Sequence, residues 1–170
     1  MSDLLPEPWL RGPIPDTDPV VSHLLRASQQ IREDIARAVG PLSGAQLWAM
    51  PDEMTPAGFH AKHLAGSTER LCAYLEGLTL TQEQLLAIAG ERAGAESSAE
   101  LTARVNAAFD RYDRIVSRLR PEEFGNVREV GRRRLRTTAI SLAIHIAEHG
   151  QRHVGQAISA AKLAQATVRA

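Results

Sequence analysis

Residues 138–166 read TAISLAIHIAEHGQRHVGQAISAAKLAQA and keep one apolar side over their whole length. That side is formed by Ile140, Ile144, Ala147, Val154, Ile158 and Ala161. Because residues three and four positions apart lie on the same face of a helix, this spacing predicts a long amphipathic helix. Such a helix must bury its apolar side against other elements, so further amphipathic helices are expected elsewhere in the chain.

Three further stretches have helical spacing and recognisable ends. Asp18-Pro19 and Thr55-Pro56 are both typical of an N-cap followed by proline at the first helical position. Gly77 and Pro121 are typical of positions just beyond a helix end. The sequence therefore predicts helices over residues 19–39, 56–77 and 101–119, in addition to the one over 138–166.

These four helices set the expected fold. Strand signals are nearly absent, because β-branched residues do not alternate with polar ones over a useful length. Four long helices with short connections predict an all-α domain, an up-and-down four-helix bundle over residues 19–170. A chain of 170 residues can bury one ordinary core, which agrees with a single domain.

The segments outside the helices are expected to be mostly irregular. Five prolines within the first 19 residues predict an irregular N-terminal arm over residues 1–18. Trp9, Leu10 and Ile14 are its apolar side chains, and we expect them to hold the arm against the bundle.

Two connections have a composition of their own. Residues 82–89 are expected to form a short helical turn, followed by a linker rich in Gly, Ala and Ser over residues 90–98. Residues 125–136 carry five arginines and two glycines, and we expect a connection with a solvated, charged face. Its arginines, which are candidates for binding an anionic substrate, are Arg128, Arg132, Arg133, Arg134 and Arg136.

Composition narrows the classes of partner. Lys plus Arg and Asp plus Glu both number 20, and aromatic residues make up only 4%, which argues against nucleic acid as a partner. The single cysteine, Cys72, excludes an intramolecular disulfide and a cysteine-based zinc cluster. The N-terminus lacks the basic and apolar parts of a signal peptide, and no run approaches 18 apolar residues. We therefore expect a cytoplasmic protein without a membrane segment.

The histidines are the main candidates for chemistry. Of six, His145, His149 and His153 stand four residues apart, so their side chains project from one face of the last helix. The pair at 149 and 153 supplies two metal ligands, and a third from the 56–77 helix, which offers His60 and His63, would leave open positions on zinc, nickel or iron. Gly, Gln and Arg separate the pair, so the glutamate-containing zinc peptidase motif is absent.

The sequence around these histidines resembles a known family. His149-Gly-Gln-Arg-His153-Val-Gly-Gln156 is similar to the last-helix pattern of the DinB-like (DinB/YfiT) superfamily, a His, three residues, then His-Arg-Gly-Gln, with Val154 in place of the usual Arg. The stretches Gly58–Leu71 and Glu7–Gly12 resemble one subgroup of it. The resemblance extends over nearly the whole chain.

The resemblance implies both a fold and a metal site. It implies a four-helix bundle whose three ligands are His63, His149 and His153, holding one divalent ion, zinc or nickel being the first candidates. His60, His145 and His23 are then candidates for groups around the ligands or for pocket walls.

Other candidates carry less chemistry. Cys72 lies in an apolar stretch and is expected to be a buried thiol without a lowered pKa. Glu69 and Glu148 do not share the ligand face by helical spacing, so neither is assigned as a general base.

The resemblance also suggests activities. Members of the superfamily include thiol-dependent S-transferases, so transfer of an external low-molecular-weight thiol to an electrophilic small molecule is our first expectation. The alternatives are metal-dependent hydrolysis of a small molecule and a non-catalytic metal-binding module linked to stress. We also expect a homodimer, from the family habit and a possible second apolar stripe on the long helices.

Overall fold

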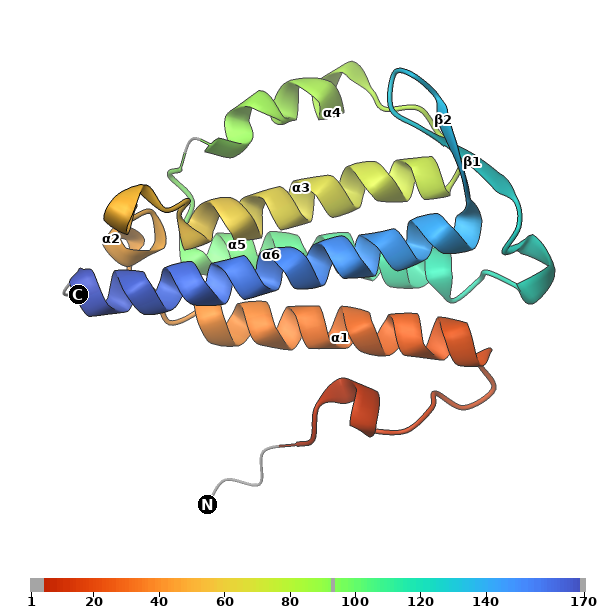
Figure 1. The fold of residues 1–170 in the computed structure, drawn as a ribbon, viewed down its shortest axis with the longest axis horizontal. Coiled ribbons are helices and arrows are strands. Elements are labelled where there is room, and N and C mark those ends of the chain that lie inside the picture. The colour runs from red at the N-terminus through yellow and green to blue at the C-terminus, as the bar shows by residue number, and fades with distance from the viewer. Residues whose placement is uncertain (1–4, 93, 169–170) are drawn as a thin grey trace.

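The computed structural model describes residues 5–92 and 94–168, and it is built almost entirely of helices (Figure 1). Four long helices pack around one apolar core: α1 (Pro19–Val39), α3 (Ala57–Leu75), α5 (Ser98–Val116) and α6 (Ala139–Thr167). The shorter helical segments are η1 (Pro8–Leu10), α2 (Gly44–Leu47), η2 (Pro51–Glu53), α4 (Gln82–Ala87), η3 (Ala89–Arg92) and η4 (Pro121–Glu123). In the described part of the chain, no helix combines the length and apolar character needed to cross a membrane.

Helix starts follow local capping chemistry. The Asp18 carboxylate accepts hydrogen bonds from the backbone N–H groups of Val20 and Val21, at 2.9 and 3.3 Å, as predicted for α1. Thr138 caps α6 by accepting from the N–H of Ser141. α3 begins one residue later than predicted, because Pro56 is the N-cap and not the first helical residue. No side chain caps that helix.

α5 begins earlier than its apolar stripe indicated. Ser97 and Glu100 form a capping box, in which each side chain accepts a hydrogen bond from the backbone N–H of the other residue. The helix therefore starts at Ser98 and ends at Val116, while the predicted range was 101–119.

The connection between α3 and α5 is longer than a simple turn. It runs back along α3 through α4 and η3, so that α3 and α5 point in the same direction, and α1 and α6 in the opposite one (Figure 1). Ion pairs agree with this direction: Lys62 near the start of α3 meets Glu96 just before α5, and Arg111 late in α5 meets Glu69 late in α3. The strictly alternating order predicted from short connections is therefore not adopted at this step.

A small antiparallel sheet replaces the irregular connection expected over residues 125–136. β1 (Val127–Val130) pairs with β2 (Leu135–Thr138), and the turn between them contains Gly131 and Arg134 with positive φ angles of 72° and 50°. Strands of four residues are too short to show a clear alternating pattern, which is why the sequence did not reveal them. The hairpin is the only sheet in the described residues, and it leads directly into α6.

The arm lies along α1 and is held mainly by polar contacts. The Arg11 guanidinium donates to both carboxylate oxygens of Glu33, at 2.6 and 2.8 Å, and the Ile14 N–H donates to the Ser22 hydroxyl at 2.8 Å. Trp9 and Leu10, expected as anchors, are 57% and 56% exposed, whereas the neighbouring proline of η1 is buried. Residues 1–4 of the predicted arm lie outside the described residues.

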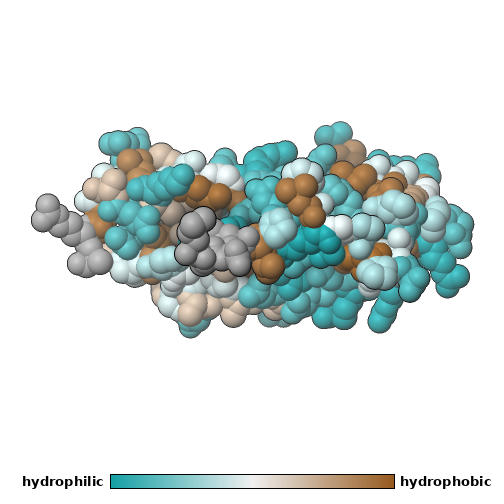
Figure 2. Space-filling view, turned by 90° about the horizontal axis from the view of Figure 1, so that it is seen from below, coloured by the Kyte–Doolittle hydropathy of each residue, from teal (hydrophilic) through white to brown (hydrophobic). Residues whose placement is uncertain are grey.

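The face that carries the arm and α1 mixes polar and apolar side chains. Figure 2, a view from this side, shows apolar residues in small patches separated by hydrophilic ones. This surface does not test the expected homodimer, which stays a prediction.

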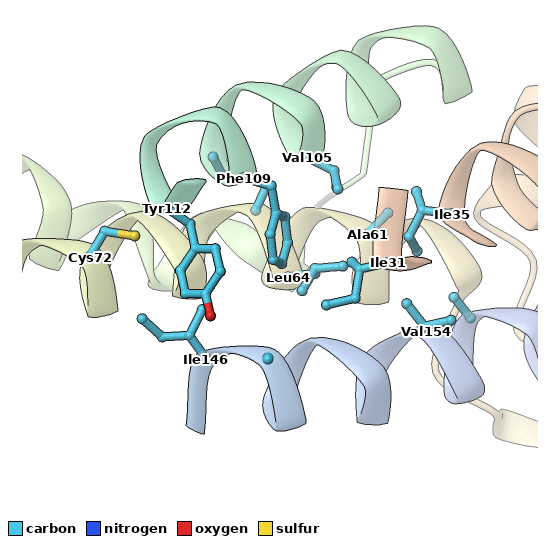
Figure 3. Packing of buried hydrophobic residues seen from close by; sticks show 14 of the residues in the cluster. Ile31, Ile35, Ala61, Leu64, Cys72, Val105, Phe109, Tyr112, Ile146 and Val154 are labelled. Carbon is cyan, nitrogen blue, oxygen red and sulfur yellow. The ribbon is translucent and has the colours of Figure 1, made fainter. Parts of the chain in front are cut away.

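The core is close-packed around two aromatic rings of α5. Phe109 and Tyr112 lie among aliphatic side chains of the other three long helices (Figure 3). The Tyr112 hydroxyl donates to the backbone oxygen of Ala143 at 3.0 Å, which satisfies its buried polar atom. Cys72 is buried as predicted, and burial raises the pKa of its thiol to about 12.

Candidate metal centre

Three histidines from two helices meet between α3 and α6. His149 and His153 lie one turn apart on α6, and His63 faces them from α3, which runs antiparallel to α6. One nitrogen from each ring lies within 4.8 Å of the other two. The ring centroids are 4.6 Å apart for His149–His153 and His63–His153, and 5.4 Å apart for His63–His149. The structure thus brings together the three residues that the family resemblance implied as ligands.

A buried carboxylate orients His63. Glu91 lies in η3, on the connection that returns over α3, and is only 6% exposed. Its Oε2 lies 2.6 Å from Nδ1 of His63, and its Oε1 accepts a hydrogen bond from Arg70 at 2.6 Å. Burial alone would raise the pKa of Glu91, but the hydrogen bonds from His63 and Arg70 outweigh burial and hold it below the ordinary value. Glu91 is therefore an ionised acceptor that fixes the orientation of the His63 ring.

A glycine makes room for this contact. A Cβ atom at Gly66 would lie 2.6 Å from Oε1 of Glu91 and 3.0 Å from the Arg70 guanidinium, so a larger residue there would displace the carboxylate. Gly66 falls within the stretch Gly58–Leu71 that resembles the family, whereas nothing in the sequence singled out Glu91. No local pattern marks Glu91, because the contact depends on the return of η3 across α3.

The other two rings also have partners at Nδ1. Nδ1 of His153 lies 3.2 Å from Nδ1 of His60, and Nδ1 of His149 lies 3.5 Å from the Ser67 hydroxyl. With Nδ1 engaged in all three rings, Nε2 is the atom left to bind an ion. His60 thus lies beside the cluster as a neighbour of His153, which is one of the roles considered for it.

The remaining two candidate histidines differ in position. His145 is exposed one turn before His149, with the ring centroids 5.9 Å apart. His23 is exposed on α1 and lines a groove between α1 and α6, together with Glu148. The structure therefore places His145 beside the cluster and His23 away from it.

The electrostatics favour neutral rings. Burial, followed by the neighbouring His63, lowers the pKa of His149 to about 4, and burial with the neighbouring His149 lowers the pKa of His153 to about 3. Both rings are then neutral at pH 7, which is the state that binds a metal ion. Zinc–imidazole bonds measure about 2.0–2.1 Å, so three nitrogens within 4.8 Å need only small ring movements to share one ion. The donor set fits a first-row divalent ion.

Neither acid named from the sequence lies at the cluster. Glu69 pairs with Arg111, at 2.8 Å, and Glu148 faces the groove beside α1. Both carboxylate oxygens of Glu91 are engaged by His63 and Arg70. Among the described residues, no carboxylate is placed beside the three rings with an oxygen free to act as a base.

Two pockets flank the cluster along α6. The first, of about 460 Å³, lies toward the C-terminal end of the helix and includes His60, Arg152 and Gln156. The second, of about 240 Å³, lies toward the N-terminal end and includes His145 and Arg136. Each pocket therefore contains a histidine that neighbours one of the three central rings.

The arginines of the hairpin are mostly engaged elsewhere. Arg128 donates to the backbone oxygen of Leu75, and Arg134 pairs with Glu129. Arg132 and Arg133 are exposed at the turn. Of the five arginines considered for anion binding, Arg136 is the one that lines the pocket containing His145.

The departure from the family pattern at Val154 falls in the core. Val154 is 2% exposed and lies among apolar side chains near Ile35 and Ala61 (Figure 3). Its side chain therefore does not line the open face of the cluster. The guanidinium next to the cluster on α6 belongs instead to Arg152, which also lowers the pKa of His149 and His153.

Comparison with known families agrees with the geometry. The family model of the DinB superfamily matches residues 27–157, a span that contains all three central histidines. No curated protein matches the chain.

Proposed function

This chain belongs to the DinB superfamily, and from that premise we propose that it is a divalent-metal enzyme that joins a low-molecular-weight thiol to an electrophilic small molecule. The observation that carries the proposal is the convergence of His63, His149 and His153 within 4.8 Å. We also interpret the four long helices as a four-helix bundle with one crossover, the connection between α3 and α5. A bundle core is a frequent place for a metal site, because facing helices bring distant side chains together.

The chain would hold the ion through Nε2 of three neutral rings. Three protein ligands leave exchangeable positions, and zinc or nickel suits this donor set. A bound divalent ion would supply Lewis acidity, which lowers the pKa of a thiol or water that reaches it. Glu91 would keep the His63 ring in the ligand orientation throughout.

The thiol must come from outside the chain. Cys72 is the single cysteine, and its thiol is buried with its pKa raised to about 12, so it is not a nucleophile at neutral pH. In the proposed reaction the external thiol loses its proton to water, and its sulfur forms a bond to the electrophilic carbon. The leaving group departs with the electron pair of the bond that breaks.

Thiol transfer is favoured over hydrolysis by the surroundings of the cluster. Activation of a water for hydrolysis is usually assisted by a positioned base. Glu91 is fully engaged by His63 and Arg70. Attack by a thiol that is already ionised needs no such base at the cluster.

A parallel activity screen tests the proposal. Zinc-loaded and nickel-loaded protein is assayed with glutathione, mycothiol and bacillithiol against electrophiles such as monochlorobimane, beside ester and amide substrates without thiol. We expect thiol-dependent conjugation that is lost in His149→Ala and kept in His23→Ala. Hydrolysis of the ester or amide substrates without thiol would contradict the proposal and indicate a hydrolase. Inactivity in every assay, with metal bound to the protein, would contradict the proposal and indicate a non-catalytic metal-binding module.

A further inference from the structure

The pocket at the C-terminal side of the cluster has polar walls. Its side chains include Thr55, His60, Arg152, Gln156 and Ser159, with Met54 as its large apolar residue. Arg152 and Gln156 are one turn apart on α6, so both present polar ends to the same space. Its described lining contains no carboxylate. The charge in this pocket therefore favours an anionic ligand.

Arg152 is available to bind such a ligand. Within residues 5–92 and 94–168, its guanidinium makes no hydrogen bond or ion pair with another residue. A guanidinium presents paired N–H donors that match the two oxygens of a carboxylate. The amide of Gln156 adds both a donor and an acceptor within the same pocket.

The pocket on the other side of the cluster differs in both size and chemistry. It measures about 240 Å³, against about 460 Å³, and its walls combine four aliphatic side chains with four polar ones: Leu71, Val130, Leu135 and Leu142, and Arg136, Thr137, Ser141 and His145. A pocket with such an aliphatic wall suits the apolar part of a small molecule, which the polar side chains can orient. The two pockets therefore differ in volume and in the number of aliphatic side chains that line them, as sites for two unlike substrates would.

We propose that the Arg152 pocket binds the carboxylate-bearing part of the thiol co-substrate, with the smaller pocket left for the electrophile. This rests on the proposed function and narrows it to one class of thiol. Glutathione and bacillithiol carry carboxylates, whereas the polar part of mycothiol is an uncharged sugar and inositol. The pocket thus selects an anionic thiol over mycothiol, through Arg152.

The test measures binding without turnover. S-methylated glutathione, bacillithiol and mycothiol have no free thiol, so their binding to the zinc-loaded protein, followed by calorimetry, reports contacts of the polar part. We expect the two anionic compounds to bind and mycothiol's derivative to bind more weakly. In Arg152→Ala the affinity for the anionic pair should fall about tenfold or more, the effect of losing a charge-assisted hydrogen bond. Arg152→Lys, which keeps the charge without the paired donors, should lie between.

Arg136→Ala is the matched control, because it removes an exposed arginine from the other pocket. It should leave the affinity for the anionic pair within about twofold. Metal content and helical signal are measured for every variant, so that loss of the ion or the fold is not mistaken for loss of the ligand site.

Three results would overturn the inference: no binding of either anionic compound, equal binding in Arg152→Ala, or an equal loss in Arg136→Ala. These are distinct from failure of the proposed function. If binding depends on Arg152 but the protein has no transferase activity, the ligand site is supported and the proposed function is wrong. If the protein transfers the thiol and Arg152→Ala leaves the KM for the thiol unchanged, the proposed function is supported and the ligand site is wrong.

Discussion

The α3–α6 interface and the core around α5 are built from opposite kinds of side chain. Between α3 and α6, His63, His149 and His153 are partly buried, each with a polar partner at Nδ1. Around α5, Phe109 and Tyr112 are fully buried among aliphatic side chains. Buried polar groups cost stability unless they are paired, whereas buried apolar groups supply it. On the proposed assignment, the two regions have separable tasks, metal binding in one and stability in the other.

The largest expected effect is the loss of bound metal when one of the three central histidines is replaced. His149→Ala should reduce the metal that co-purifies with the protein from about one ion per chain to nearly none, because it leaves only two ligands. His23→Ala, which removes a histidine from the groove beside α1, should leave the content unchanged. Elemental analysis after purification without chelators measures both. Equal metal content in the two variants would remove the three-histidine assignment.

Truncation of a core side chain should instead lower the stability of the fold. Phe109→Ala leaves a cavity in a close-packed region, and the free energy of unfolding should fall by about 3–5 kcal/mol. Phe109→Leu, which removes less volume, should lose less. Urea titration measures both changes, and the folded fraction of each variant should still bind one metal ion. A loss of metal without a loss of stability would break the proposed separation of tasks.

Replacement of Glu91 tests whether the carboxylate that orients His63 contributes to metal affinity. Glu91→Gln removes the negative charge that His63 and Arg70 contact, and we expect metal affinity to fall about 10- to 100-fold. Glu83→Gln, an exposed change on α4, is the control and should not alter affinity. Competition with a chelating dye gives the two affinities. An unchanged affinity in Glu91→Gln would mean that the carboxylate only stabilises the return of η3.

The smallest expected effect concerns two glycines of α6 that have different surroundings. A Cβ at Gly150 would lie 2.6 Å from Cδ1 of Ile31, whereas one at Gly155 would have nothing within 4 Å. Gly150→Ala should therefore lower the free energy of unfolding by about 1 kcal/mol, since overpacking outweighs the gain in helix propensity. Gly155→Ala should raise it by about 0.5–1 kcal/mol. Thermal unfolding of both variants checks the difference, and a gain in both would mean that the Ile31 side chain moves aside at little cost.

The sequence by itself determined the features that depend on near neighbours. Asp18 and Thr138 cap the helices that follow them, because an N-cap acts within three residues. The spacing of His149 and His153 placed their rings on one face of α6, since a helix repeats every 3.6 residues. His63 was identified only through the family resemblance, because spacing alone left His60 as an equal candidate.

Only the tertiary structure decided the features that join distant segments. Glu91 meets His63 across 28 residues, on a connection whose path back along α3 no local pattern predicts. The same return makes α3 and α5 run in one direction. The flanking pockets exist because α3 and α6 enclose them together with the hairpin in one case and residues 54–55 in the other. Capping and periodicity act within a turn or two, whereas these contacts depend on how whole helices pack and on the path of the chain between them.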